Sequence, residues 1–450
     1  MLKKGLISLA LVSQFAQAQA PENIIYIVGD GMGPEFVTAY RYFKDDPATP
    51  EVERTIFDKY LVGTASTYPA PVSGYVTDSA AGATALAAGI KTYNGAIGVD
   101  VDKKPVNTVF HTAKRMGMKT GAVVTSQVNH ATPAGFIAHN ESRRNYNEIA
   151  DSYLDDTLEG KIKFDLLMGG GWQYFIRDDR NLVTEFKQKG FQYVDSYGDI
   201  SSLNISKPAL GLFADVGLPY VLDDSDKARL SLMTKQATKQ LEDKDGFFLL
   251  VEASQVDWAG HSNDIASAMY EMDDLAKTLE YLEGYVKENP DTLVILTADH
   301  STGGMSIAAN GIYEWNPEDI RNISHSPRYF GKKFVDSTIT QQGIKETLNL
   351  SFTEQEVELL NQAKIDALVK LENYNANKQG NKGKKPNVAY AIESALKDII
   401  DKRTNTGWTT GGHIATDVPV IAFGHSAAVF SGNQDNTDIA KKVFKLLAQK

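Results

Sequence analysis

The chain has 450 residues, of which 42% are hydrophobic and 23% are charged, a composition that suits a large folded core and excludes a disordered or fibrous protein. Its 57 acidic and 46 basic residues give a formal charge of −11, which argues against a surface that binds nucleic acid or anionic lipid. The sequence contains no cysteine, so disulfides, thiolate metal sites and cysteine nucleophiles are excluded. Any metal site must therefore use histidine and carboxylate side chains.

The first eighteen residues predict a secretory signal peptide. Lys3 and Lys4 precede a mostly apolar run, Leu6 to Ala16, which ends in the small-x-small sequence Ala16-Gln17-Ala18. The run is shorter than the roughly 20 residues that a membrane span needs. We expect cleavage after Ala18 and a periplasmic or secreted mature chain, residues 19–450, that does not enter the membrane. The alternative is an N-terminal helix of the core.

Short apolar runs recur along the chain, each followed by a polar or glycine-containing turn and a segment with helical spacing. This alternation predicts an α/β fold, with a central, mostly parallel β-sheet and helices on both faces. The clearest helix is predicted over Asp264 to Val286, where apolar residues recur three or four apart. We expect residues 19–450 to form a single domain. The predicted strands are 24–28, 121–125, 164–168, 247–251, 293–297 and 418–423.

Residues from about 303 to 406 differ from this pattern and predict an insertion. Two helical segments are expected there, Thr353 to Tyr374 and Val388 to Asp401. The last predicted strand follows the segment, so the chain should leave the sheet and return to it. We expect this crown-like or lid-like segment to cover a site or to contact a second subunit, and favour the subunit contact.

Metal-type side chains follow four of the predicted strands, at the edge where an open α/β sheet binds its ligands. Asp257 and His261 are four residues apart, so on one helical turn they point the same way and can hold one ion. His413, in a glycine loop, could supply a further imidazole. A single acid at such a place is more often a helix cap or turn former, but four together are hard to explain that way. The side chains after the strands are Asp30, His130, Thr132, Glu252, Asp257, His261, Asp299 and His300.

Ser79 stands at the head of a predicted helix of small residues, where free backbone N–H groups favour an anion. Spacing alone favours the simpler interpretation that Ser79 caps the helix. The neighbouring metal-type residues favour a nucleophile instead. No Gly-x-Ser-x-Gly motif surrounds Ser79, so a metal would have to lower the pKa of its hydroxyl.

The motifs together resemble the alkaline phosphatase family. They occur in the family's order over most of the mature chain, and the insertion is the part least covered. The motifs are Gly29-Asp30-Gly31-Met32-Gly33, Thr77-Asp78-Ser79-Ala80-Ala81, residues 252–261, Thr297-Ala298-Asp299-His300 and Gly412-His413.

The resemblance implies an enzyme that hydrolyses small phosphate monoesters through a phosphoserine on Ser79, with two Zn²⁺ and one Mg²⁺. It implies that Arg143 clamps the phosphate, with Arg144 as the alternative. It also implies a homodimer, with no nucleic acid bound beyond a terminal phosphate taken as substrate. The implied ligands are Asp257, His261 and His413 for one zinc, Asp30, Asp299 and His300 for the second, and Asp30, Thr132 and Glu252 for magnesium.

Two positions depart from the best-known bacterial pattern of the family. His130 stands where that pattern has an aspartate near magnesium, and Trp258 stands where it has a lysine. Both resemble the branch of animal and some marine bacterial enzymes. Because an imidazole is a poorer partner for magnesium than a carboxylate, the third metal is expected to bind more weakly or to be zinc.

Two alternatives use the same residues. Phosphodiesterases, sulfatases and phosphomutases resemble the same metal core, but sulfatases need a Cys/Ser-x-Pro-x-Arg setting that Ser79 lacks, and diesterases more often use threonine as nucleophile. An exported metal- or phosphate-binding protein without turnover is the second alternative. A metal-dependent rate of hydrolysis would exclude it.

Overall fold

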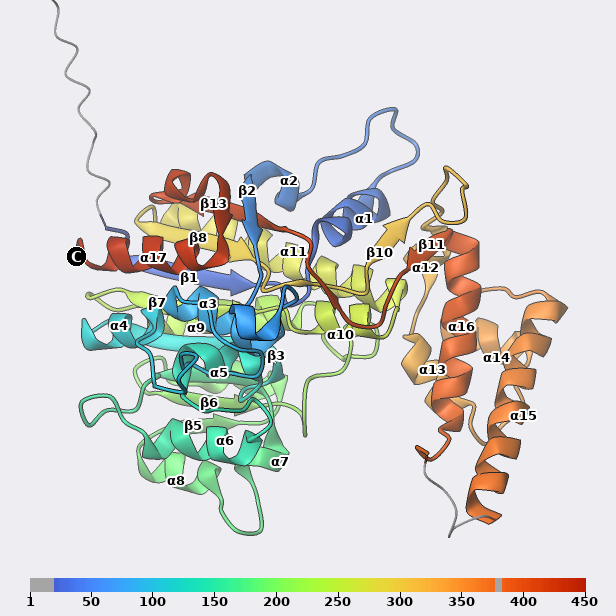
Figure 1. Ribbon diagram of the computed structural model, residues 1–450, viewed down its shortest axis with the longest axis horizontal. Coiled ribbons are helices and arrows are strands. Elements are labelled where there is room, and N and C mark those ends of the chain that lie inside the picture. The colour runs from blue at the N-terminus through green and yellow to red at the C-terminus, as the bar shows by residue number, and fades with distance from the viewer. Residues whose placement is uncertain (1–19, 377–382) are drawn as a thin grey trace, which may run out of the picture.

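A computed structural model describes residues 20–376 and 383–450, so the predicted signal peptide lies outside the described residues. The fold is built on a ten-stranded sheet in the order β14-β2-β13-β8-β1-β7-β3-β4-β6-β5, whose strands follow one another from β13 in the upper part of Figure 1 to β5 in the lower part. Its strands are β1 (Asn23–Val28), β2 (Leu61–Ser66), β3 (Lys119–Gln127), β4 (Leu166–Gly170), β5 (Gln192–Val194), β6 (Ala209–Leu212), β7 (Phe247–Glu252), β8 (Thr292–Thr297), β13 (Val418–Gly424) and β14 (Gly432–Asp435).

The predicted fold class is confirmed, because neighbouring strands are parallel everywhere except at β13, which is antiparallel to both β8 and β2. Each predicted strand overlaps an observed one. β1 lies between β7 and β8, and its residues 24–28 are fully buried. A continuous apolar run of this kind suits a strand covered on both faces.

Four strands of this sheet were not predicted: β2, β5, β6 and β14. β5 has three residues and lies at one edge of the sheet, β14 lies at the other edge, and β2 is only partly buried. In β2, a Cβ placed on Gly63 would lie 2.1 Å from the carbonyl oxygen of Gly432. The close approach of these two strands therefore requires glycine, a residue whose presence lowers the sequence signal for a strand.

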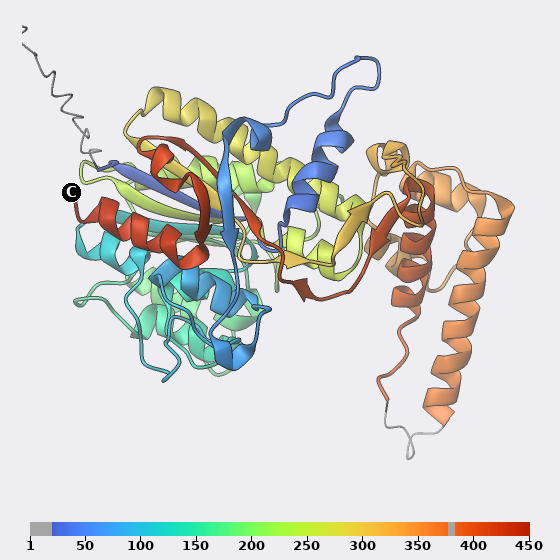
Figure 2. The ribbon, with the colours of Figure 1, turned by 45° about the horizontal axis from the view of Figure 1, so that its top comes forward.

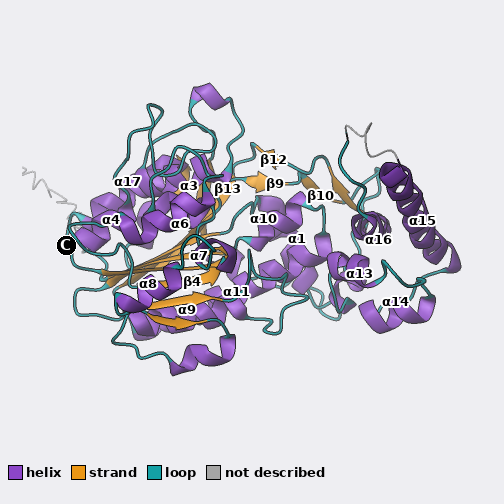
Figure 3. Cartoon of the chain, turned by 90° about the horizontal axis from the view of Figure 1, so that it is seen from below, coloured by secondary structure: helices purple, strands orange, loops and turns teal. Residues whose placement is uncertain are grey.

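Helices cover both faces of the sheet (Figure 3). The long helix α11 begins where Asp264 accepts a hydrogen bond from the backbone N–H of Ser267, close to the predicted start. Within the described residues no helix is long and apolar enough to cross a membrane. One face carries α3 (Ser79–Ala88), α4 (Val109–Arg115), α5 (Ala131–Ile137) and α17 (Asn436–Leu447), and the other carries α1 (Pro34–Lys44), α9 (Arg229–Leu241) and α11 (Ile265–Glu288). The remaining helices of this part are α2 (Ile56–Tyr60), α6 (Tyr146–Asp155), α7 (Trp172–Phe175), α8 (Leu182–Gln188) and α10 (Gln255–His261).

A helical segment, residues 308–405, extends to one side of the sheet (Figures 1 and 2). The two strands that bracket it, β10 (Met305–Ile307) and β11 (Thr406–Trp408), pair with each other in antiparallel fashion, so the chain leaves and re-enters the body at one place. Beside this pair, β9 (Ser301–Thr302) pairs with β12 (His413–Ile414). The helices of the segment are α12 (Glu318–Asn322), α13 (Pro327–Lys333), α14 (Gln341–Leu348), α15 (Glu354–Ala376) and α16 (Val388–Thr404).

Candidate active site

The carboxyl ends of three adjacent parallel strands bring acidic residues together. Val28, the last residue of β1, is in register with Glu252 on β7 and with Thr297 on β8. Asp30 and Asp299 each follow two residues after these ends, and all three carboxylates are fully buried. Like charges buried this close are costly unless a cation or protons compensate them.

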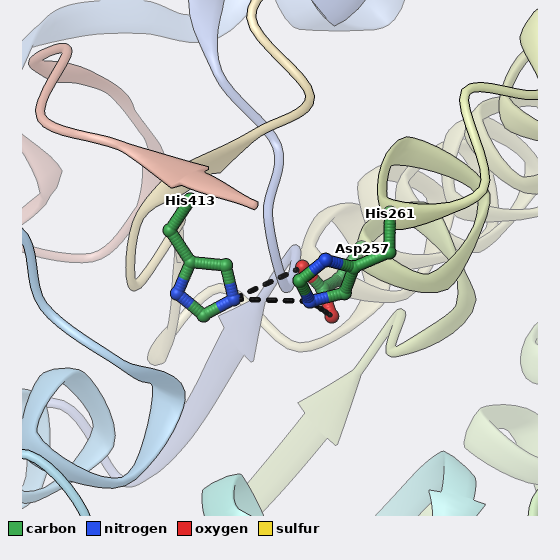
Figure 4. Close-up of side chains that lie close together, drawn as sticks. All are labelled: Asp257, His261 and His413. Atoms are coloured by element: carbon green, nitrogen blue, oxygen red, sulfur yellow. Dashed lines mark hydrogen bonds and ion pairs between the residues drawn. The ribbon is translucent and has the colours of Figure 1, made fainter. Parts of the chain in front are cut away.

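The first of three clusters of metal-type side chains consists of Asp257, His261 and His413, and we call it group 1. Asp257 and His261 lie one turn apart on α10, and His413 faces them from β12 (Figure 4). The two histidine Nε2 atoms are 3.1 Å apart, and they lie 3.4 Å (His261) and 3.7 Å (His413) from the carboxylate oxygens of Asp257.

Backbone carbonyls orient both histidines of group 1. His261 Nδ1 lies 2.7 Å from the carbonyl oxygen of Gly411, and His413 Nδ1 lies 2.9 Å from that of Thr77. A carbonyl only accepts, so each Nδ1 carries a proton, and Nε2 is the nitrogen that faces the other residues of the group. Histidines that bind metals are typically held in this way.

The second cluster, group 2, consists of Asp30, Asp299 and His300 and lies against Ser79. His300 Nε2 is 3.1 Å from Ser79 Oγ, 3.3 Å from Asp299 Oδ2 and 3.5 Å from Asp30 Oδ1. Burial lowers the pKa of His300, so its ring is neutral. Burial, and then repulsion from neighbouring carboxylates, raises the pKa values of Asp30 and Asp299.

The third cluster, group 3, consists of Asp30, His130 and Glu252, so Asp30 belongs to two groups. Glu252 Oε2 accepts a hydrogen bond from Ser126 Oγ at 3.1 Å, and burial raises the pKa of Glu252 to about 7. Buried polar atoms without a hydrogen-bond partner gather in groups 2 and 3 and at the neighbouring Thr132. They are both carboxylate oxygens of Asp30, Asp299 Oδ2, Glu252 Oε1, Thr132 Oγ1 and His130 Nδ1.

Ser79 is the first residue of α3, and the cap of that helix is Asp78, whose carboxylate accepts from the backbone N–H of Ala81 at 3.0 Å. The simpler interpretation of Ser79 as a helix cap is therefore wrong. α3 approaches group 2 closely, since a Cβ on Gly82 would lie 3.0 Å from Asp299 Cβ. Because its residues are small, α3 can bring its N-terminus, the positive end of the helix, where Ser79 lies, close to the carboxylates of group 2.

Of the two candidate arginines, Arg143 is the one that faces this site. Its Nη1 donates to Asp78 Oδ2 at 3.1 Å and its Nη2 to His130 Nε2 at 3.2 Å, whereas Arg144 is exposed. Because a guanidinium only donates, His130 Nε2 must accept, and burial keeps the pKa of His130 low. The proton of the neutral ring therefore lies on Nδ1. Trp258, on α10, packs edge-on against this ring with centroids 5.9 Å apart.

Comparison with known proteins identifies the family of this chain. The model of the alkaline phosphatase family matches residues 21–449. The chain belongs to the alkaline phosphatase family. The predicted family and enzyme class, a hydrolase, are thereby confirmed.

Relatives in bacteria and fungi show the same family over most of the chain. It is 46% identical to alkaline phosphatase 3 of Bacillus subtilis, over 95% of this chain and 89% of the relative. It is 33% identical to the repressible alkaline phosphatase of Saccharomyces cerevisiae, over 97% of this chain and 83% of the relative.

Solved structures agree with the fold. A cold-active alkaline phosphatase from a psychrophilic Shewanella is 46% identical and superposes with a TM-score of 0.85, over 94% of this chain and 99% of that chain. A mutant of the TAB5 alkaline phosphatase, with a histidine changed to glutamate and magnesium bound in its M3 site, is 26% identical, with a TM-score of 0.68 over 96% of this chain and 99% of that chain.

Two residues of the site did not emerge from the sequence. Thr302, on β9, is fully buried between groups 1 and 2, with its hydroxyl near both Asp257 and His300. Ser126, on β3, holds Glu252. Thr302 stands two residues after His300 in an extended segment, a spacing that places both side chains on one side and was a usable signal.

Proposed function

We propose that this alkaline phosphatase-family enzyme hydrolyses phosphate monoesters with Ser79 as the nucleophile, two zinc ions at groups 1 and 2, and magnesium at group 3. The observation that supports this most is the convergence of groups 1 and 2 on one helix end. Ser79 Oγ lies 3.1 Å from His300 Nε2. The carbonyl of Thr77, two residues before Ser79, accepts a hydrogen bond from His413 Nδ1.

The side chains present fit the proposed ions. Two imidazoles and a carboxylate in group 1, and one imidazole and two carboxylates in group 2, are typical zinc donors. Oxygens of Asp30, Thr132 and Glu252 suit magnesium, with water completing its shell. The buried oxygens without hydrogen-bond partners are the atoms that a cation would satisfy. When bound, the ions would supply Lewis acidity, lowering the pKa of the serine hydroxyl and neutralising charge on the phosphoryl oxygens.

The proposed reaction has two displacements at phosphorus. Ser79 Oγ loses its proton and forms a bond to phosphorus while the bond to the leaving alcohol breaks, and the alcohol takes up a proton. Water then attacks the phosphoserine, the Oγ–phosphorus bond breaks, and Ser79 regains its proton as inorganic phosphate leaves. Each step transfers one phosphoryl group without a redox change.

Arg143 and the N-terminus of α3 would hold the phosphoryl oxygens during both steps. Asp78 and His130 accept hydrogen bonds from the two terminal nitrogens of Arg143, which fixes the plane of the guanidinium. A planar donor pair binds two phosphoryl oxygens at once. The backbone N–H groups at the helix start add a positive partial charge beside Ser79.

The first experiment is hydrolysis of p-nitrophenyl phosphate at alkaline pH by the purified mature chain. We expect activity to disappear on chelation, to return with zinc and magnesium, and to be nearly absent in Ser79→Ala, with phosphate trapped on Ser79 detectable by mass spectrometry in the wild type. Bis-p-nitrophenyl phosphate serves as the diester control. If the metal-loaded chain cleaves the diester and not the monoester, the proposal is wrong.

We also propose export and a homodimer. The family match begins at residue 21, just after the predicted cleavage at Ala18, which supports a leader before the enzyme. Sequencing the N-terminus of the exported protein tests the cleavage site.

The homodimer follows from the family resemblance, and light scattering of the purified enzyme tests it. We further propose that the helical segment of residues 308–405 contacts the second subunit. A variant that lacks this segment and remains dimeric would contradict the proposed contact.

A further inference from the structure

We infer that α16, in the helical segment of residues 308–405, positions the two histidines of group 1, and that Lys397 and Asp401 are the positioning residues through which it acts. Only the assignment of zinc to group 1 rests on the proposed function. The segment would then be part of the metal-binding architecture as well as a surface feature.

Lys397 reaches from α16 to the end of the helix that carries His261. Its side chain is only 7% exposed, and its Nζ donates to the carbonyl oxygen of Ser262 at 2.6 Å and to Glu393 Oε1 at 3.3 Å. Ser262 directly follows His261 and caps α10. An ammonium is buried only where such partners hold it, so this contact fixes the backbone beside His261.

Asp401 forms a second contact one turn later on α16. Its Oδ1 accepts a hydrogen bond from Trp408 Nε1 at 3.3 Å. The indole packs so closely on Gly303 that a Cβ there would lie 2.7 Å from the ring. Gly303 N in turn donates to the carbonyl oxygen of Gly412 at 2.9 Å. This chain of contacts fixes the backbone just before His413.

The two contacts converge on one hydrogen bond. Lys397 holds the end of α10, and Asp401 holds the strand β11 that leads to the Gly411 carbonyl. His261 Nδ1 donates to that carbonyl at 2.7 Å. Lys397 and Asp401 are four residues apart and so lie on the same face of α16. A metal site tolerates errors of only about 0.5 Å in the positions of its ligands. Weakening either contact should therefore displace both histidines enough to affect metal binding.

The test compares Lys397→Met, which keeps the stem but cannot donate, with Lys402→Met, its matched control. Lys402 is exposed on the same helix. Zinc per chain is measured at buffered free zinc, together with the rate at which the chelator 4-(2-pyridylazo)resorcinol removes it. We expect Lys397→Met to weaken one of two zinc sites about tenfold, at the low end of losses for groups that orient ligands. Lys402→Met should match the wild type, and Lys397→Arg should restore part of the affinity.

A folded Lys397→Met that binds and releases both zinc ions like the wild type would overturn the inference, even if its metal-free form melts earlier. An equal loss in Lys402→Met would also overturn it. If Lys397→Met does not fold, Trp408→Phe decides, since it removes the N–H donor and keeps a ring on Gly303; unchanged zinc binding there would overturn the inference. Because zinc is counted without substrate, a wild type that binds two zinc ions but hydrolyses no monoester would refute the proposed function alone.

Discussion

Thr302 donates a hydrogen bond from its hydroxyl to Asp257 Oδ1 across 2.6 Å. Thr302 Oγ1 also lies 3.2 Å from His300 Nδ1. Because the hydroxyl uses its one proton in the hydrogen bond to Asp257, it accepts a hydrogen bond from His300 Nδ1. One buried hydroxyl therefore sets the tautomer of a histidine in group 2 and the orientation of a carboxylate in group 1. The two proposed zinc sites are thus mechanically linked through Thr302.

Removing this hydroxyl should weaken both zinc sites. Thr302→Val keeps the shape of the side chain but can neither donate nor accept, so we expect kcat/KM to fall about 10- to 100-fold, the usual loss when a partner of metal ligands is removed. Zinc per chain after dialysis measures the cause directly. Thr302→Ser retains the hydroxyl and should stay close to the wild type. Full activity and full zinc content in Thr302→Val would refute the link.

Arg143 and Arg144 offer a matched pair for testing the phosphate clamp. Only Arg143 contacts Asp78 and His130 beside Ser79, and Arg144 is exposed. Loss of a group that stabilises transition-state charge costs about 10²- to 10³-fold, so Arg143→Ala should lower kcat/KM by about 100-fold and weaken inhibition by inorganic phosphate. Arg144→Ala should change neither quantity by more than about twofold. The opposite ranking would assign the clamp to Arg144.

We expect His130 to limit the binding of the proposed third metal, because Arg143 donates to its Nε2 and leaves the proton on Nδ1. A protonated nitrogen is not a ligand, so group 3 offers magnesium fewer donors than its residues suggest. His130→Asp should accept from Arg143 and also bind the ion, and we expect it to retain more magnesium at a fixed free concentration. Metal analysis measures this, with zinc content as the internal control. A variant with no gain in magnesium would show that His130 does not set the occupancy.

Much of the fold could be predicted because its signals are local. The central strands are continuous apolar runs, and the four-residue spacing of Asp257 and His261 places them on one turn of α10. His413 carries no such signal. It joins group 1 only because β12 pairs with β9, more than 100 residues earlier in the sequence, so its place depends on tertiary structure.

The edge strands of the sheet and the orientation of individual side chains could not be predicted from the sequence. Gly63 in β2 serves a close approach to Gly432 that only the folded chain reveals. Likewise, the proton of His130 is placed by Arg143 from another segment. A sequence pattern identifies which residues gather at the carboxyl ends of strands, whereas tautomers and hydrogen bonds follow from distances between elements.

Glu252 provides a pH-dependent prediction for the metal-free protein. Burial raises its pKa from an ordinary value of 4.5 to about 7, so the folded state retains a proton that the unfolded chain loses at lower pH. The free energy of unfolding of the metal-free protein should therefore decrease as the pH rises from about 4.5 to about 7, by at most about 3 kcal/mol from this group.

Glu252→Gln removes that titration while keeping the shape of the side chain. Denaturant unfolding of the metal-free variant should show it to be more stable than the wild type at pH 8 and equally stable near pH 4.5. With magnesium present the order should reverse at pH 8, because the amide is a poorer ligand than the carboxylate. A metal-free variant that is less stable than the wild type at pH 8 would mean that Glu252 is charged and well compensated in the folded protein.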